Sequence, residues 1–271
     1  MRCKCSGLFA LGLAVLLSAS STAWAQLSSF AVLGGSTVTN TNTPTTVNGN
    51  LGVSPGSAVT GFPPGIVTGG TIHAADAVAA QAQTDLTTTY NNLANQSCNT
   101  DLTGQDLGGK TLTPGVYCFS TSAQLTGTLT LNAQGDPNAL FIFKIGSTLT
   151  TASASSVLLI NGGSPCDVFW QLGSSATLGT GTALLGSIVA LTSITLNTGA
   201  SVSGRVLARN GAVTLDNSHV AVCSGGAGPG SGPLFPFFSA QIPTLSQWAL
   251  IVMTVLLFLM ALVALRRRAA A

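Results

Sequence analysis

Short apolar stretches alternate with turns rich in Gly, Asn, Ser and Thr along residues 26–223. One Thr-Leu phrase recurs there, and its leucines are separated by steps of 20, 29, 18 and 19 residues: Leu129, Leu149, Leu178, Leu196 and Leu215. A period near 18 to 20 residues with several short strands per turn is typical of a β-solenoid. The long step contains residues 161–166, which we interpret as a loop inserted between two strands.

The phrase predicts which side chains face the solvent. If each leucine points into the core, its neighbours in the strand point outward. Successive turns of a solenoid stack at about 4.8 Å, so equivalent residues form columns. The predicted exposed column consists of Thr128, Thr148, Thr177, Thr195 and Thr214.

One segment breaks the strand pattern and predicts a helix over residues 71–94. Its apolar positions recur every three or four residues, and they are Ile72, Ala75, Ala79, Ala82, Leu86 and Leu93. Thr71 is the predicted N-cap. The small alanines favour close packing on a sheet, and the natural partners are the apolar stretches 140–143 and 187–190.

Charge is scarce in this chain of 271 residues, because only 6% of them are charged and all seven acids are Asp. Such a composition disfavours a helical bundle, a coiled coil and an acidic disordered protein. Five of the nine basic residues lie near the two ends, which leaves four against seven Asp and a net charge of about −3 in between. A nucleic-acid partner is therefore not expected.

The two ends are typical of sorting segments. Residues 1–25 have a basic start, an apolar stretch and a small-residue cleavage pattern, which predict a secretory signal peptide. Residues 249–265 are apolar enough for a short membrane span, and the arginines at 266–268 follow them. The preceding Ile242-Pro243-Thr244-Leu245-Ser246 completes a segment, residues 242–268, that resembles the IPTL-CTERM sorting signal. The resemblance implies a sorting machinery as partner. Residues 224–241 form a Gly- and Pro-rich linker.

Four cysteines remain in the exported part, and an even number in an exported protein indicates disulfides. Three connectivities are possible, of which we favour Cys98–Cys118 and Cys166–Cys223. A metal site is not expected, because no Cys-x-x-Cys pair exists and His73 and His219 lack ligand spacing.

The sequence offers little for catalysis. It contains no nucleophile-elbow or phosphate-loop motif, and its aspartates form no pair that predicts a glycosidase. We therefore expect no catalytic residue and no cofactor. What remains is an uncharged array of small hydroxyl and methyl groups on a stiff scaffold, which suits a regular target such as ice or crystalline polysaccharide.

Several phrases spread through residues 26–223 resemble the DUF3494 ice-binding protein family. They are residues 29–40, 49–56, 69–77, 112–117 and 204–216. The resemblance implies an all-β, discontinuous right-handed β-helix of triangular section with one long helix packed along it. It also implies adsorption to ice, which inhibits ice growth and recrystallisation.

Many members of that family carry a Thr-Ala/Gly-x-Thr/Asn motif on one flat face. This chain has similar segments beginning at Thr151, Thr180, Thr198 and Asn217. The resemblance therefore assigns ice binding to Thr151, Ser153, Thr180, Thr182, Thr198, Ser201 and Asn217. The Thr column at 148, 177, 195 and 214 is the second choice.

The predicted function is that of an exported ice-binding protein, which is anchored at the cell surface or released after C-terminal processing. The alternative is a surface adhesin or matrix protein that binds polysaccharide or cells through the same flat face. An enzyme acting on glycans ranks third.

Overall fold

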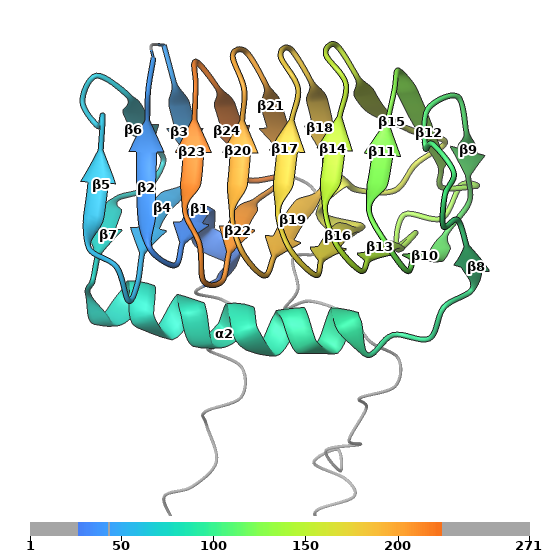
Figure 1. Cartoon of the computed structure of the whole chain (residues 1–271), viewed down its shortest axis with the longest axis horizontal. Helices are drawn as coiled ribbons and strands as arrows, with labels where there is room; N and C mark the ends of the chain where they lie inside the picture. The colour runs from blue at the N-terminus through green and yellow to red at the C-terminus, as the bar shows by residue number, and fades with distance from the viewer. Residues whose placement is uncertain (1–26, 43, 224–271) are drawn as a thin grey trace, which may run out of the picture. The chain divides into compact units, whose positions relative to one another are not determined.

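The computed structural model describes residues 27–42 and 44–223 (Figure 1). The predicted signal peptide, the linker and the C-terminal sorting segment with its apolar stretch lie outside these residues. Within the described ranges, no helix combines the length and the apolar character needed to cross a membrane.

Three parallel sheets form the sides of a solenoid, and we call them sheets A, B and C. Sheet A contains, in spatial order, β7 (Ile72–Ala74), β4 (Asn50–Val53), β1 (Phe30–Gly34), β22 (Val206–Ala208), β19 (Ser187–Ala190), β16 (Val168–Leu172), β13 (Phe141–Ile145), β10 (Gly115–Phe119) and β8 (Thr100–Asp101). Sheet B contains β11 (Ala123–Leu125), β14 (Leu149–Thr151), β17 (Ala176–Leu178), β20 (Ile194–Leu196), β23 (Val213–Leu215), β2 (Thr37–Asn40) and β5 (Ala58–Thr60). Sheet C contains β6 (Ile66–Thr68), β3 (Thr46–Asn48), β24 (His219–Ala221), β21 (Ser201–Ser203), β18 (Ala183–Leu185), β15 (Ser156–Ile160), β12 (Thr128–Asn132) and β9 (Thr111–Leu112).

The chain winds through sheets A, B and C in turn, but it starts in the middle of the solenoid. β1 lies beside β22, and β3 lies beside β24, although more than 170 residues separate the paired residues Val32 and Val206. From β1 the chain winds to β7 at one end and returns through helix α2 (Ala77–Ala94). It then restarts with β8 at the other end and winds back to the middle (Figure 1). The solenoid is thus discontinuous, whereas its right-handed winding stays a prediction.

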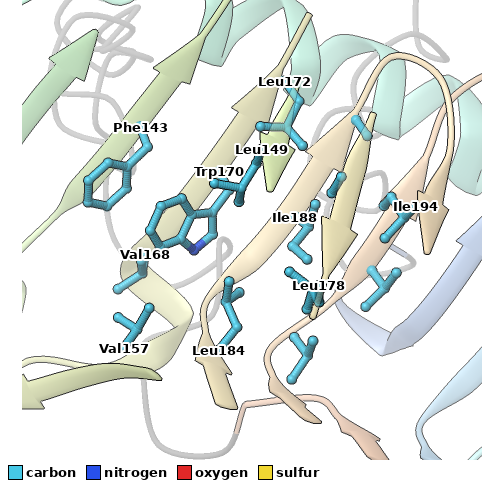
Figure 2. Close-up of a cluster of buried hydrophobic side chains, with 14 of the residues drawn as sticks. Phe143, Leu149, Val157, Val168, Trp170, Leu172, Leu178, Leu184, Ile188 and Ile194 are labelled. Atoms are coloured by element: carbon cyan, nitrogen blue, oxygen red, sulfur yellow. The ribbon is translucent and has the colours of Figure 1, made fainter. Parts of the chain in front are cut away.

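The interior is a set of stacked apolar columns. On sheet A, Tyr117 pairs with Phe143, Phe143 with Trp170, and Trp170 with Ile188. The rings of Phe143 and Trp170 stack with centroids 4.0 Å apart, and the Trp170 indole N–H donates to the Leu185 carbonyl (2.9 Å). Figure 2 shows Trp170 between Phe143 and Ile188. Such an aromatic pair adds roughly 0.5–1.5 kcal/mol to the burial of its area.

Strand register corrects the predicted Thr column. Leu178, Leu196 and Leu215 do share one buried column, as expected. Leu149, however, pairs with Ala176, so the phrase is shifted by two residues in this turn. Thr150, and not Thr148, is therefore the neighbour of Thr177. The placement of Thr128 is also wrong, because Thr128 lies on β12 of sheet C.

The helix begins later than the sequence predicts. Residues 72–74 form β7, the last strand of sheet A, and Ile72 is 43% exposed there. Asp76 is the N-cap in place of Thr71, and its Oδ1 accepts a hydrogen bond from the Ala79 N–H (2.8 Å). The buried stripe of α2 consists of Ala79, Ala82, Asp85, Leu86, Thr89 and Leu93.

Helix α2 packs against sheet A, where it contacts β4, β7, β13, β16 and β19. The predicted packing against the stretches 140–143 and 187–190 is confirmed, because these stretches belong to β13 and β19. Both favoured disulfides, Cys98–Cys118 and Cys166–Cys223, are also confirmed. The second disulfide ties the predicted insertion, which ends in the short helix η1 (Pro165–Asp167), to the end of the described chain.

Candidate functional site

The outer face of sheet B carries a column of threonines. The strand register aligns seven outward side chains, one from each strand, and we call them the sheet B threonine column: Gln124, Thr150, Thr177, Thr195, Thr214, Thr39 and Thr60. Their inward neighbours, such as Ile194 and Leu196 beside Thr195, are fully buried. The alternation within each strand therefore holds the threonines on the outside.

A second outward column runs parallel to the first, two residues earlier in each strand. It consists of small side chains, which are Ser122, Thr148, Ser175, Ser193, Ala212, Thr37 and Ala58. The hydroxyls of Ser122 and Thr148 lie 2.8 Å apart. The two columns form a grid of about 4.8 Å between strands and about 6.7 Å along a strand.

The side chains of this grid carry no charge, and all of them except Gln124 are short. Neither column contains an Asp, a Lys or an Arg, and threonine has a restricted χ1 that limits the entropy lost when the face is covered. The strands of sheet B lie side by side and free of α2, which follows the lower edge of the solenoid in Figure 1. Sheet B can therefore meet a flat, regular surface.

The other two sheets are less suitable for such a surface. Sheet A is covered by α2. The outer face of sheet C is mixed, because Leu158 (50% exposed), Ile66 (53% exposed) and His219 interrupt its polar positions. A repeated hydroxyl pattern is thus a property of sheet B.

Three of the seven residues assigned from the family motif lie exposed at the corner between sheets B and C. Ser153, Thr180 and Thr198 are exposed in successive turns there. Backbone hydrogen bonds stack these turns, from the Ala154 N–H to the Thr180 carbonyl and from the Gly181 N–H to the Thr198 carbonyl. The next residue in the row is Asp216, whose carbonyl accepts from the Gly199 N–H. Ser153, Thr180, Thr198 and Asp216 thus form a row of side chains that borders sheet B, and we call it the corner row.

Two of the assigned residues are not on the surface at all. Thr151 is 3% exposed and Thr182 is fully buried. Their hydroxyls lie 2.7 Å apart, and the Gly179 N–H donates to the Thr151 hydroxyl (2.9 Å). Their burial does not fit a role on an exposed binding face. For Thr151 the reason is the register shift described above, which places it in the inner column that Leu178 occupies in the next turn.

The remaining two assigned residues also lie off the grid. Ser201 belongs to β21 and faces outward on sheet C, between Ala183 and His219. Asn217 lies in a turn with φ of 46°, and Gly181 and Gly199 have φ of 68° and 74° at the equivalent turns. A left-handed backbone favours Gly and Asn. The Gly positions of the motif segments therefore serve the turns of the solenoid.

Asp216 is the one charged side chain in the corner row. It accepts hydrogen bonds from the Thr198 hydroxyl (2.5 Å) and from the Asn42 amide (2.7 Å). These two hydrogen bonds lower the pKa of the Asp216 carboxyl, so it is charged at neutral pH. Its partners come from the turns on either side, and the carboxylate thus links three stacked turns. Within residues 27–42 and 44–223, no group of three or more His, Cys, Asp or Glu side chains could hold a metal ion.

Comparison with known families gives two matches. A family model described as "Ice-binding-like" matches residues 32–221, and one described as "IPTL-CTERM motif" matches residues 240–268. The chain is 65% identical over 195 residues to a protein of Nostoc sp. named "Ice-binding protein", which covers 72% of this chain and 71% of the relative. It is 34% identical to "Ice-binding protein 1" of Shewanella frigidimarina, over 72% of this chain and 25% of that larger relative.

Solved structures match the same part of the chain. An ice-binding protein from an Antarctic biological consortium superposes with a TM-score of 0.71 at 42% identity, covering 79% of this chain and 96% of that one. An ice-binding protein from Antarctomyces psychrotrophicus gives a TM-score of 0.71 at 37% identity, covering 74% and 98%. Because the match covers nearly the whole of these solved chains, the solenoid folds on its own in these relatives.

Proposed function

The chain belongs to the ice-binding-like family, and from this premise we propose that it adsorbs to ice through the outer face of sheet B. The observation that carries the proposal is the aligned column, in which six of the seven strands of sheet B place a threonine at the same position. Adsorption through this face inhibits the growth and recrystallisation of ice. We assign no catalytic residue to it.

The grid gives two kinds of contact at each threonine. The methyl groups remove apolar surface from water, and the hydroxyls hold water in fixed positions between neighbouring columns. Since the backbone fixes the column spacing, the water held by successive strands is already ordered before ice is met. The spacing between strands is close to a repeat of the ice lattice, so this water can merge with the crystal surface.

The location of the protein follows from its C-terminal segment. The IPTL-CTERM motif at residues 240–268 indicates export and sorting at the cell surface. We further propose that residues 1–25 are removed as a signal peptide and that residues 249–265 hold the chain in a membrane until the sorting machinery processes it. The exposed part would then be residues 26–223, with two disulfides suited to an oxidising compartment.

A bulky side chain placed at the centre of the grid tests the proposed face. We expect Thr195→Tyr to lose most thermal hysteresis and most inhibition of ice recrystallisation in purified residues 26–223, because the ring would lift the flat face from the crystal. The matched control is Ser201→Tyr on sheet C, which should keep both activities. Circular dichroism and a thiol assay verify that both variants fold with their disulfides.

The opposite pattern of activity in the two variants would place the ice-binding site on another face. If Ser201→Tyr were inactive and Thr195→Tyr active, ice would bind sheet C or the corner row. If both variants and the parent were inactive while folded, ice binding itself would be excluded for this chain.

A further inference from the structure

A hollow of about 520 Å³ opens beside the C-terminal half of α2, and its lining extends to the residues that lead from sheet A into sheet B. Tyr90 contributes to it from the helix, and Lys144 and Gln171 contribute from sheet A. Asp101, Cys98 and Cys118 also line it, and the two cysteines form a disulfide. Its volume lies within the roughly 300–1,000 Å³ that is usual for small-molecule sites.

The hollow lies where one outward column of sheet A changes from apolar to polar side chains. Over the middle of the sheet this column is apolar, with Val189, Leu207 and Leu33 paired in register beneath α2. Towards β8 it becomes Gln171, Lys144, Cys118 and Asp101. The helix ends at Ala94, so polar side chains occupy the column where the helix cover ends.

Gln171 is the most informative of these residues. It is only 6% exposed, yet its side-chain amide has no hydrogen-bond partner within the described residues. The amide nitrogen and oxygen are not fully enclosed by protein, so they are open to the hollow. Gln171 lines the hollow, so the amide can meet a ligand there as both donor and acceptor.

Three neighbouring groups also have unused hydrogen-bonding capacity within the described part of the chain. The Lys144 ammonium has three N–H donors, and one of them donates to the Gln96 carbonyl (2.5 Å). Asp101 accepts from the Thr103 N–H and hydroxyl through Oδ1, which leaves Oδ2 for another donor. The Tyr90 hydroxyl has no partner there, while the guanidinium of Arg209 lies over the Tyr90 ring at 4.7 Å.

We propose that this hollow binds one ring of a neutral saccharide. Adjacent sugar hydroxyls each donate and accept hydrogen bonds, and the free groups of Lys144, Gln171, Asp101 and Tyr90 supply both functions. The charges of Lys144 and Asp101 oppose each other, so the lining favours a polar ligand without net charge over an anion or a cation. No residue of the sheet B grid lines this hollow, and the proposal does not depend on ice binding.

The test is a titration of the folded domain, residues 26–223, with glucose, galactose, mannose and N-acetylglucosamine, followed by amide NMR. At least one sugar should shift the Gln171 side-chain amide signal in a saturable way. Gln171→Met and Lys144→Met keep much of the side-chain length and should weaken this binding by about tenfold or more. The matched control, Lys110→Met outside the hollow, should bind as the parent does.

Three results would overturn the proposal. The first is that none of the four sugars shifts the Gln171 signal of the parent domain. The second is that shifts occur only on sheet B, which would place sugar recognition on the flat face. The third is that acetate or glycine shifts the same signals when the sugars do not, which would make the hollow a site for charged ligands. Thermal hysteresis of Gln171→Met should equal that of the parent.

Discussion

Thr150 and Thr151 are chain neighbours with opposite surroundings, because successive side chains of a strand point to opposite faces. Thr150 lies in the exposed column, whereas Thr151 is buried and its hydroxyl accepts from the Gly179 N–H and pairs with Thr182. We expect Thr151→Val to lower the free energy of unfolding by about 1–3 kcal/mol, since it leaves buried groups without partners. Urea unfolding measures this change.

Thr150→Val is the matched control, and it should change stability by no more than about 0.5 kcal/mol. A similar loss of stability in both variants would contradict the burial that separates these two residues. Folded Thr151→Val should also keep its thermal hysteresis, which would confirm that this hydroxyl serves the interior.

The burial of Asp85 leads us to expect that the stability of the folded protein depends on pH. It lies on the buried stripe of α2, where one carboxylate oxygen accepts from the Gln81 amide and the other has no partner. Burial raises the pKa of Asp85 above its ordinary value. A carboxyl whose pKa is raised by folding stabilises the protein at low pH and loses that contribution as pH rises towards the raised pKa.

We therefore expect Asp85→Asn to be more stable than the parent at neutral pH, with the difference vanishing below the ordinary pKa of Asp. Thermal unfolding across this pH range measures the effect. An equal difference at every pH would show that packing, and not charge, governs this position.

At the residue scale, sequence alone predicted the alternation of side chains but not the register. The Thr-Leu phrase was correctly aligned at Leu178, Leu196 and Leu215. The alignment failed at Leu149, because Leu149 pairs with Ala176 in the next turn and not with Leu178, which lies two residues later. Register is set by hydrogen bonds between turns, and a repeat of small residues leaves several alignments equally possible.

At the scale of the element, the start of α2 depends on Asp76. The carboxylate caps the helix through the Ala79 N–H (2.8 Å) and also contacts the His73 ring (2.7 Å). These two hydrogen bonds, the first being the larger cause, lower the pKa of Asp76. The contribution of Asp76 to stability is then present above the ordinary pKa of Asp and is lost as pH falls through the lowered value.

We expect Asp76→Ala to lower the thermal unfolding midpoint at neutral pH and to lose this part of the acid dependence. Asp76→Asn is the control, because its side-chain oxygen still accepts from the helix. Should Asp76→Ala melt as the parent does, the cap would not contribute to the stability of the domain.

The helix itself was predictable from its alanine and leucine spacing, but its first residue was not. Thr71 and Asp76 both satisfy the requirement for an N-cap, and Ile72 continues the apolar spacing. The choice depends on β7, which pairs with β4 and takes residues 72–74 into sheet A. A partner strand far away in sequence therefore overrides a local helix pattern.

At the scale of the whole molecule, the two disulfides close loops of different size. Cys166 and Cys223 are 57 residues apart, and Cys98 and Cys118 are 20 apart. On the chain-entropy account, removing either disulfide costs about 3–4 kcal/mol, and the longer loop costs about 1 kcal/mol more. We expect the Cys166→Ser, Cys223→Ser double variant to be the less stable one in urea unfolding. The reverse order would show that native packing outweighs loop length.

The solenoid and both cysteine pairs could be predicted from the sequence, whereas the position of the chain ends in the stack could not. Nothing in a repeat of similar turns marks where β1 inserts, because every turn can pair with every other. The contacts of Arg205 show where the two ends of the described chain lie in the stack. Its guanidinium donates to the Ser28 carbonyl (2.9 Å) and lies 3.7 Å from the Cys223 sulfur, so both ends of the described chain meet at one buried side chain.

This arrangement predicts that the discontinuity can be removed. β24 ends a turn in sheet C, and the next turn of the stack begins with β1 in sheet A. A circular permutant that joins Cys223 to Leu27 through a short linker and opens the chain between Gln96 and Ser97 would wind without interruption from β8 to β7 and end with α2. We expect it to fold with both disulfides and to keep its thermal hysteresis.

It should also fold faster than the parent, because β1 and β22 come close in sequence and the mean separation of contacting residues falls. Stopped-flow refolding measures the rate. A permutant with the same linker but opened inside β19, between Ile188 and Val189, is the control and should fail to fold, since the break removes buried strand pairing. If the first permutant failed as well, the order in which the chain builds the stack, and not the final set of contacts alone, would determine whether this solenoid forms.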